Sequence, residues 1–139
     1  MKRLATLGLG LAVLLGACTG GPSGEELHSA ARSLVPEGAS IVDEVEGRCV
    51  ELAPDPSCVH VYFLGPEASL SDRVAAVERR ALGAGWRLID KESLLGGTHL
   101  LLEMTAMKAS VMIRSGETCG SIEPRDCADA AFVEGDFGL

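Results

Sequence analysis

A short apolar run at the amino terminus limits which part of this 139-residue chain can fold as a domain. Lys2 and Arg3 precede an apolar stretch from Leu4 to Leu15, and small residues then lead into Cys18. The stretch is too short to span a bilayer comfortably, and a positive head, a short apolar run and small residues are the parts of a cleaved export signal. Removal of residues 1–17 leaves 122 residues, which is enough for one small domain.

The end of the run, Leu15-Gly16-Ala17-Cys18, resembles the lipobox of bacterial lipoprotein precursors. A lipobox has an aliphatic residue, two small residues and then the cysteine, and all four positions match. The resemblance covers about the first 20 residues, and no family is recognised for the mature domain. It implies that the signal is cut before Cys18 and that Cys18 carries a diacylglyceryl group. The protein is then anchored in the lipid bilayer of the cell membrane, on its extracytoplasmic face. An ordinary secretory signal that is cleaved near a cysteine is the alternative.

Charge and composition disfavour three classes of ligand. Without residues 1–17 the chain has ten basic and twenty acidic residues, a formal net charge of about −10, and Arg79-Arg80 is its only basic pair. Such a surface disfavours binding to nucleic acid or to anionic lipid headgroups by charge. The chain has no Asn or Gln and few aromatic residues, so a carbohydrate site is also disfavoured.

Four cysteines follow Cys18, and an even number in an exported domain predicts disulfides. We expect Cys49 to pair with Cys58 and Cys119 with Cys127, because each pair is close in sequence and brackets turn residues. Zinc is the competing interpretation, but the chain has no Cys-x-x-Cys pair.

The hydrophobic pattern predicts an α+β fold. The expected architecture has two layers, an antiparallel sheet of four or five strands with one or two helices packed on it, in the order α-β-β-α-β-β-β. Residues 18–24 form a lipidated tether, and residues 25–139 form the domain. The predicted elements are helices at 24–34 and 69–82, strands within 40–52, at 58–64 and from 86 onward, and a hairpin across 98–113.

The hairpin at 98–113 has an alternative, and the strand within 40–52 carries a prediction about which side chains share a face. A single helix across 98–113 is the alternative to the hairpin, because Leu, Met, Ala and Lys favour helices. Within 40–52 we expect Ile41 and Val45 to share one face, with Asp43, Glu44 and Glu46 on the solvent side. The acidic segment 115–139 is predicted to be a turn-rich tail that docks through its few apolar residues.

The sequence contains few candidate catalytic or metal-binding residues. Three histidines, at 28, 60 and 99, lie far apart and form no ligand pair, and we find no nucleophile elbow or phosphate-binding glycine loop. The one weak metal alternative combines Met104, Met107, Met112 and His99, since thioether and imidazole ligands suit Cu(I).

The sequence therefore predicts a non-enzymatic binding or envelope-assembly module that needs no cofactor. Its partner would be an envelope protein or a small ligand. A small-ligand or copper carrier is the alternative, and an enzyme comes third.

Overall fold

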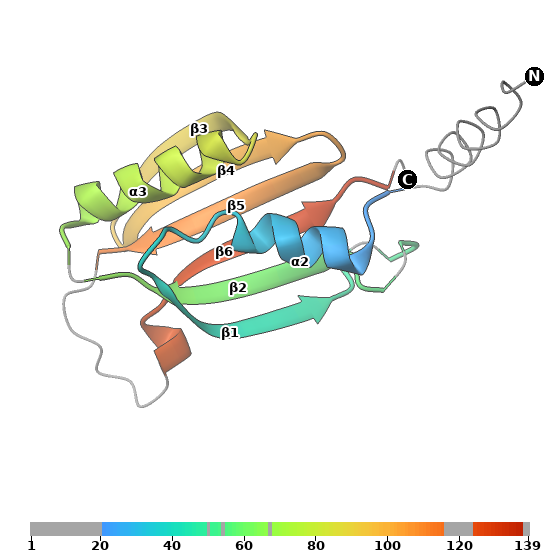
Figure 1. Ribbon diagram of the computed structural model, residues 1–139, viewed down its shortest axis with the longest axis horizontal. Coiled ribbons are helices and arrows are strands. Elements are labelled where there is room, and N and C mark those ends of the chain that lie inside the picture. The colour runs from blue at the N-terminus through green and yellow to red at the C-terminus, as the bar shows by residue number, and fades with distance from the viewer. Residues whose placement is uncertain (1–20, 50, 54, 67, 116–123, 138–139) are drawn as a thin grey trace, which may run out of the picture.

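The computed structural model describes residues 21–49, 51–53, 55–66, 68–115 and 124–137. These form one six-stranded antiparallel sheet with strand order β1-β2-β6-β5-β4-β3 and two helices on one of its faces (Figure 1). Within these ranges no helix is long and apolar enough to cross a membrane. In chain order the elements are α2 (Gly24–Arg32), β1 (Ser40–Gly47), β2 (Cys58–Leu64), α3 (Leu70–Gly83), β3 (Arg87–Leu94), β4 (Gly97–Met104), β5 (Met107–Arg114), the 3₁₀ turn η1 (Pro124–Asp126) and β6 (Asp129–Gly135).

The α+β class and the first seven elements confirm the predicted order, but the sheet has six strands rather than four or five. The missed strand is β6, which lies in the segment predicted to be a turn-rich tail. It is a central strand between β2 and β5. Its inward side chains include Asp129 and Ala131, whose low hydrophobicity gives a weak alternating pattern, and only Val133 among them is strongly apolar.

Serine caps the first turn of both helices. The Ser23 hydroxyl accepts a hydrogen bond from the Glu26 N–H at 3.2 Å, and the Ser69 hydroxyl accepts one from the Asp72 N–H at 3.2 Å. Each bond satisfies a backbone donor that the first helical turn leaves unpaired. Helix α2 ends at Arg32, two residues earlier than predicted.

A hairpin, and not a helix, occupies residues 98–113. Met104 of β4 lies opposite Met107 of β5 across a two-residue turn in which Ala106 has a φ of 64°. Gly97 begins β4 with a φ of 145°, and a Cβ there would overlap the Ile113 carbonyl oxygen. The glycine is thus required by the close approach of β5.

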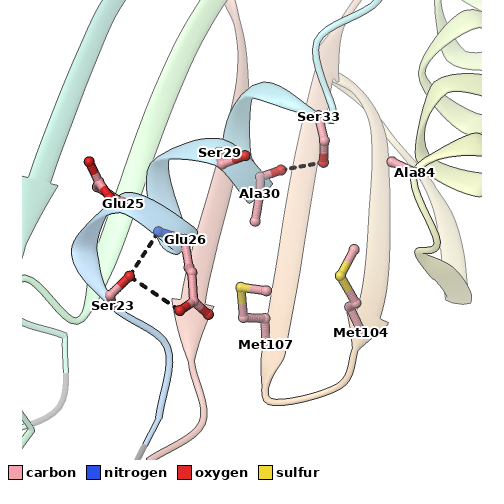
Figure 2. Close-up of a pocket in the computed structure, with 9 residues that line it drawn as sticks. All are labelled: Ser23, Glu25, Glu26, Ser29, Ala30, Ser33, Ala84, Met104 and Met107. Atoms are coloured by element: carbon pink, nitrogen blue, oxygen red, sulfur yellow. Dashed lines mark hydrogen bonds between the residues drawn. The ribbon is translucent and has the colours of Figure 1, made fainter. Parts of the chain in front are cut away.

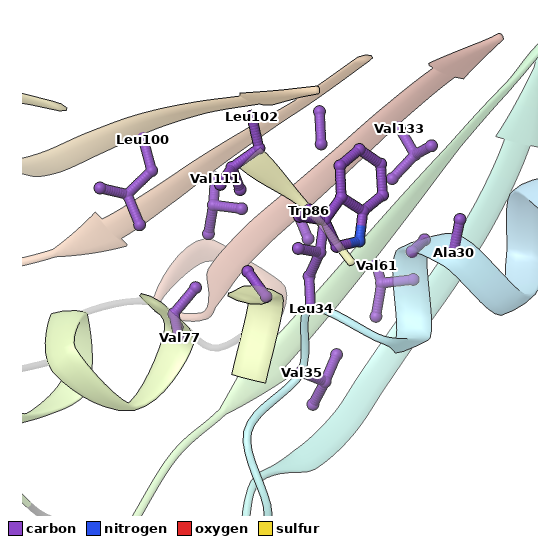
Figure 3. Close-up of a cluster of buried hydrophobic side chains, with 14 of the residues drawn as sticks. Ala30, Leu34, Val35, Val61, Val77, Trp86, Leu100, Leu102, Val111 and Val133 are labelled. Atoms are coloured by element: carbon purple, nitrogen blue, oxygen red, sulfur yellow. The ribbon is translucent and has the colours of Figure 1, made fainter. Parts of the chain in front are cut away.

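The apolar core lies between the helices and one face of the sheet (Figure 3). Val77 of α3 and Leu34 after α2 are fully buried there with Val61 and Val111 of the central strands. Trp86 is 2% exposed, and its Nε1–H donates to the Ser33 hydroxyl at 2.9 Å.

The sheet edges are irregular. The pairing of β1 shifts between Ile41 and Asp43, and that of β3 shifts between Leu88 and Asp90. A bulge of this kind changes which face the following side chains occupy. Ile41 therefore pairs with a residue of the helix-covered face and Val45 with one of the opposite face, so the prediction that they share a face is wrong. Bulges and charges also discourage pairing with another strand.

One predicted crosslink is confirmed. Cys49 and Cys58 form a disulfide, with their Cα atoms 5.8 Å apart. Cys127 is also disulfide-bonded. Its expected partner, Cys119, lies outside the described residues, as does Cys18, so the 119–127 pairing and the lipidation stay predictions.

Candidate functional site

The face of the sheet opposite the helices is the first candidate surface, and we call it the open face. Because directly opposed residues of antiparallel strands point to the same side, the register identifies its side chains. A central row crosses five strands, with Val45 on β1, His60 on β2, Phe132 on β6, Ser110 on β5 and Leu101 on β4.

A second row on the open face runs beside the first. It contains Tyr62 of β2, Ala130 of β6, Met112 of β5 and His99 of β4, in register with one another. Of the described elements, only the turn η1 contacts this face, at one corner. There Arg125 lies 4.6 Å from the centre of the Tyr62 ring. The rest of this row carries no covering layer of described residues (Figure 1).

The centre of the open face is aromatic. The rings of His60 and Phe132 are 4.4 Å apart between centroids, and His60 also stacks with Tyr62 at 6.0 Å. Burial by these neighbours lowers the pKa of His60, and the positive charge of Arg125 lowers it further. His60 therefore favours the neutral form and acts as an aromatic member of the patch.

His99 has a different role on the same face. Its Nε2 lies 2.5 Å from the Ser110 hydroxyl, and Glu92 of β3 lies opposite it in the register. Ser110, His99 and Glu92 are the residue types of a nucleophilic triad, but acyl transfer also needs free N–H groups to hold an oxyanion. The central strands β4 and β5 are paired on both sides, so their ladder N–H groups are engaged.

The structure divides the proposed copper ligands into two pairs. Met112 and His99 are cross-strand neighbours on the open face, whereas Met104 and Met107 are cross-strand neighbours on the helix-covered face. The sheet separates the two pairs, so the four residues do not converge on one metal. Among the described residues, no group of three or more His, Cys, Asp or Glu side chains is arranged to hold a metal ion.

Met104 and Met107 instead form the floor of a groove beside α2 (Figure 2). Its volume is about 510 Å³, and Ala84 lies on the side opposite the helix. The helix side is polar, with Glu26 and Ser29 among its lining residues. The groove thus combines a soft apolar floor with carboxylate and hydroxyl groups.

His28 joins α2 to the edge strand β1. Its Nδ1 lies 2.6 Å from a Glu44 oxygen and its Nε2 lies 2.8 Å from a Glu46 oxygen. Carboxylates accept hydrogen bonds, so both ring nitrogens donate and the ring is cationic. The bonds to Glu46 and Glu44 raise the pKa of His28. Burial tends to raise the pKa of Glu44, but hydrogen bonds from His28 and Arg32 outweigh it and the pKa is lowered.

The expectation that these carboxylates lie on the solvent side of the strand is wrong for Glu44, whose side chain is 17% exposed. The bulge in β1 turns Glu44 and Glu46 toward α2, opposite Val61 and Val59 of β2. The sequence gives no usable signal for this contact, because the alternation of apolar and polar residues does not reveal a bulge or the register that the bulge changes.

A buried ion pair was also not predicted. Asp129 is 3% exposed and accepts hydrogen bonds from Arg73 Nη1 at 3.1 Å and from the Arg114 N–H at 2.8 Å. Burial raises the pKa of Asp129 although these donors oppose the shift. The pair connects α3 to β5 and β6, so its role is structural.

The described residues therefore offer two surfaces for recognition, the open face and the groove beside α2. Neither is marked by a motif in the sequence, and both are assembled by strand register. The chain matches no protein-family model, no curated protein and no solved structure.

Proposed function

We propose that this protein is an extracytoplasmic lipoprotein, anchored through a lipidated Cys18, that binds another envelope protein through its open face. The observation that carries the proposal is the aromatic centre of that face, which no described layer covers. A patch of half-buried aromatic and apolar side chains with a polar rim is typical of a protein interface. The role is binding and not catalysis.

We assign the protein partner to the open face and a small ligand to the groove. The groove described above lies on the other side of the sheet, and small ligands bind in concave sites. The β3 edge of the open face adds Asp90 and Glu92, so its rim is acidic there. We therefore expect the partner to present an apolar surface with basic residues beside it.

A charge placed on the open face tests this proposal. Leu101 is 37% exposed in the central row of the face, on β4, and Leu82 is 62% exposed on α3, away from it. Leu101→Glu should abolish the crosslink that the wild-type protein forms with its partner in intact envelopes, and Leu82→Glu should leave that crosslink unchanged. Equal loss, or no loss, in the two variants contradicts binding through this face.

The anchor has its own test. Cys18→Ala should abolish lipid labelling and block processing by the lipoprotein peptidase. A diacylglyceryl thioether supplies at least two acyl chains, which gives stable attachment. Recovery of the wild-type protein with no lipid on its amino-terminal peptide refutes the anchor.

The groove beside α2 supports a second candidate function, a carrier of a small ligand or of copper. Its volume of about 510 Å³ lies within the range of small-molecule sites. Titration with Cu(I) against a competing chelator tests the copper version. If the groove holds copper, replacing Met104 and Met107 by Leu removes stoichiometric binding, and Met112→Leu does not. These substitutions nearly conserve volume.

A further inference from the structure

The chain enters the domain at one end of the sheet, which we call the anchor end. Pro22 is buried and lies near Gly135 at the end of β6. The Asp136 N–H donates to the Ala106 carbonyl in the β4–β5 turn at 2.8 Å. The amino-terminal segment, the carboxyl-terminal segment and this turn all lie at the same end of the molecule (Figure 1).

These contacts shorten the tether. Pro22, Ser23 and Gly24 belong to the folded domain, because Ser23 caps α2 and Gly24 begins it. Only three peptide units separate Cys18 from Gly21, and a fully extended chain of that length spans about 10 Å. A strand of eight residues such as β4 is about 25 Å long. The anchor end therefore stays close to Cys18, and the opposite end can lie much farther away.

Among the described residues, the loop between β1 and β2 displays one large apolar side chain at the anchor end. Leu52 is 81% exposed in the loop that the Cys49–Cys58 disulfide closes. The loop is held on the domain, because its neighbour Ala53 is buried and the Ser57 carbonyl accepts a hydrogen bond from the Gly135 N–H at 3.0 Å. Leu52 is thus presented outward from a fixed loop.

We infer that the anchor end contacts the lipid bilayer and that Leu52 inserts into it, a conclusion that rests on the proposed lipidation of Cys18. The contact is made by the apolar Leu52 and not by charge, because its exposed neighbours Glu51 and Asp55 are acidic and do not attract anionic headgroups. Insertion removes an exposed leucine from water while these carboxylates stay among the headgroups. The sheet then extends away from the membrane.

The alternative orientation, with the open face flat on the bilayer, is unfavourable. That face carries the carboxylates of Asp90, Glu92 and Glu134. A flat orientation presses all three against lipid at once and removes their water, which is costly for charged groups, whereas Glu51 and Asp55 can stay hydrated beside a single inserted leucine. An orientation on the anchor end leaves the open face in water, where a partner protein can reach it.

Tryptophan quenching by lipid tests the orientation. Leu95 is fully exposed in the β3–β4 turn, at the end opposite Leu52, and is the matched control. The mature lipoprotein is reconstituted in vesicles of phosphatidylethanolamine and phosphatidylglycerol with brominated acyl chains. The wild type, whose single Trp86 is buried, gives the baseline. Leu52→Trp should add emission that brominated lipid quenches, and Leu95→Trp should add emission that it does not.

Each other outcome is decisive. Quenching at both positions means that the domain lies flat, and quenching at neither means that it stands clear of the bilayer; both overturn the inference. Flotation with vesicles and the mass of the amino-terminal peptide separate these failures from failure of the anchor. Protein that carries no lipid on Cys18 and does not float refutes the anchor and the orientation together.

Discussion

Removal of Arg73 should be one of the most damaging single changes to this domain. Arg73 Nη1 lies 3.1 Å from both carboxylate oxygens of Asp129, and its Nη2 donates to the Arg114 carbonyl at 2.5 Å. In Arg73→Met the Asp129 side chain, which is almost fully buried, keeps only the Arg114 N–H as a donor. Breaking a buried pair in this way costs about 3–5 kcal/mol, a large part of the roughly 5–15 kcal/mol that stabilises a typical domain.

The pH dependence of the stability lost in Arg73→Met shows whether the unpaired Asp129 carboxylate causes the loss. The pKa of Asp129 is already raised in the folded protein, mainly by burial. A carboxyl of this kind contributes stability that is fully present below its unfolded pKa and is lost as pH rises through its folded pKa. Loss of Arg73 raises the folded pKa further. Arg73→Met should therefore cost much less free energy of unfolding near pH 4 than at pH 7.

Urea unfolding followed through the fluorescence of Trp86 measures this directly, because Trp86 is the only tryptophan and is buried. Arg79→Met, an exposed arginine on the same helix, is the control and should change stability by about half a kcal/mol or less. Adding Asp129→Ala to Arg73→Met should recover part of the loss, since it removes the unpaired charge. An equal cost at both pH values, or strictly additive effects of the two substitutions, would refute the argument.

Three further predictions concern packing, protonation and crosslinks. Val77→Asp buries an unpaired charge and should cost several kcal/mol in thermal unfolding. Glu78→Ala beside it loses a partly exposed ion pair with Lys91 and should cost only about 1 kcal/mol or less; equal costs contradict the facing of α3. The raised pKa of His28 means that its stabilisation is complete below the unfolded pKa and is lost as pH rises through the folded pKa. His28→Gln should therefore cost about 1 kcal/mol near pH 5.5, above the pKa of an ordinary glutamate and below that of an unfolded histidine, and less at high pH; a cost equal at the two pH values refutes the charged pair. Peptide mapping without reductant should show Cys119 joined to Cys127, and any other partner refutes the local pairing.

The helices and the hairpin could be predicted because each combines a strong period with local punctuation. Ser23 and Ser69 cap apolar stripes that repeat at helical spacing, and a Gly pair at 96–97 precedes the alternating residues of β4. These signals act within a few residues, so the sequence reveals them without knowledge of the fold. The strand β6 lacked such a signal, because alanine at 130 and 131 suits either a strand or a loop.

The candidate site could not be predicted, for a physical reason. Phe132 and His60 meet because β6 enters the sheet beside β2, a pairing between segments that are distant in sequence. The identity of each residue suggested a core or surface role, and only the register places both on the same face. The four proposed copper ligands do not converge for the same reason, since Met104 and Met112 lie on opposite faces of the sheet.

The small size of the domain explains why no described helix covers the open face. Among the described residues two helices cover one side of the six strands and no helix covers the other, so that side must be stable in water. Contacts between neighbours on the face supply this stability, because the rings of His60, Phe132 and Tyr62 shield one another and the small Ala130 lies beside them. The domain is thus expected to fold before it meets its partner. Binding then adds the burial of a preformed surface, so an open-face variant such as Leu101→Glu should lose the partner and keep its fold.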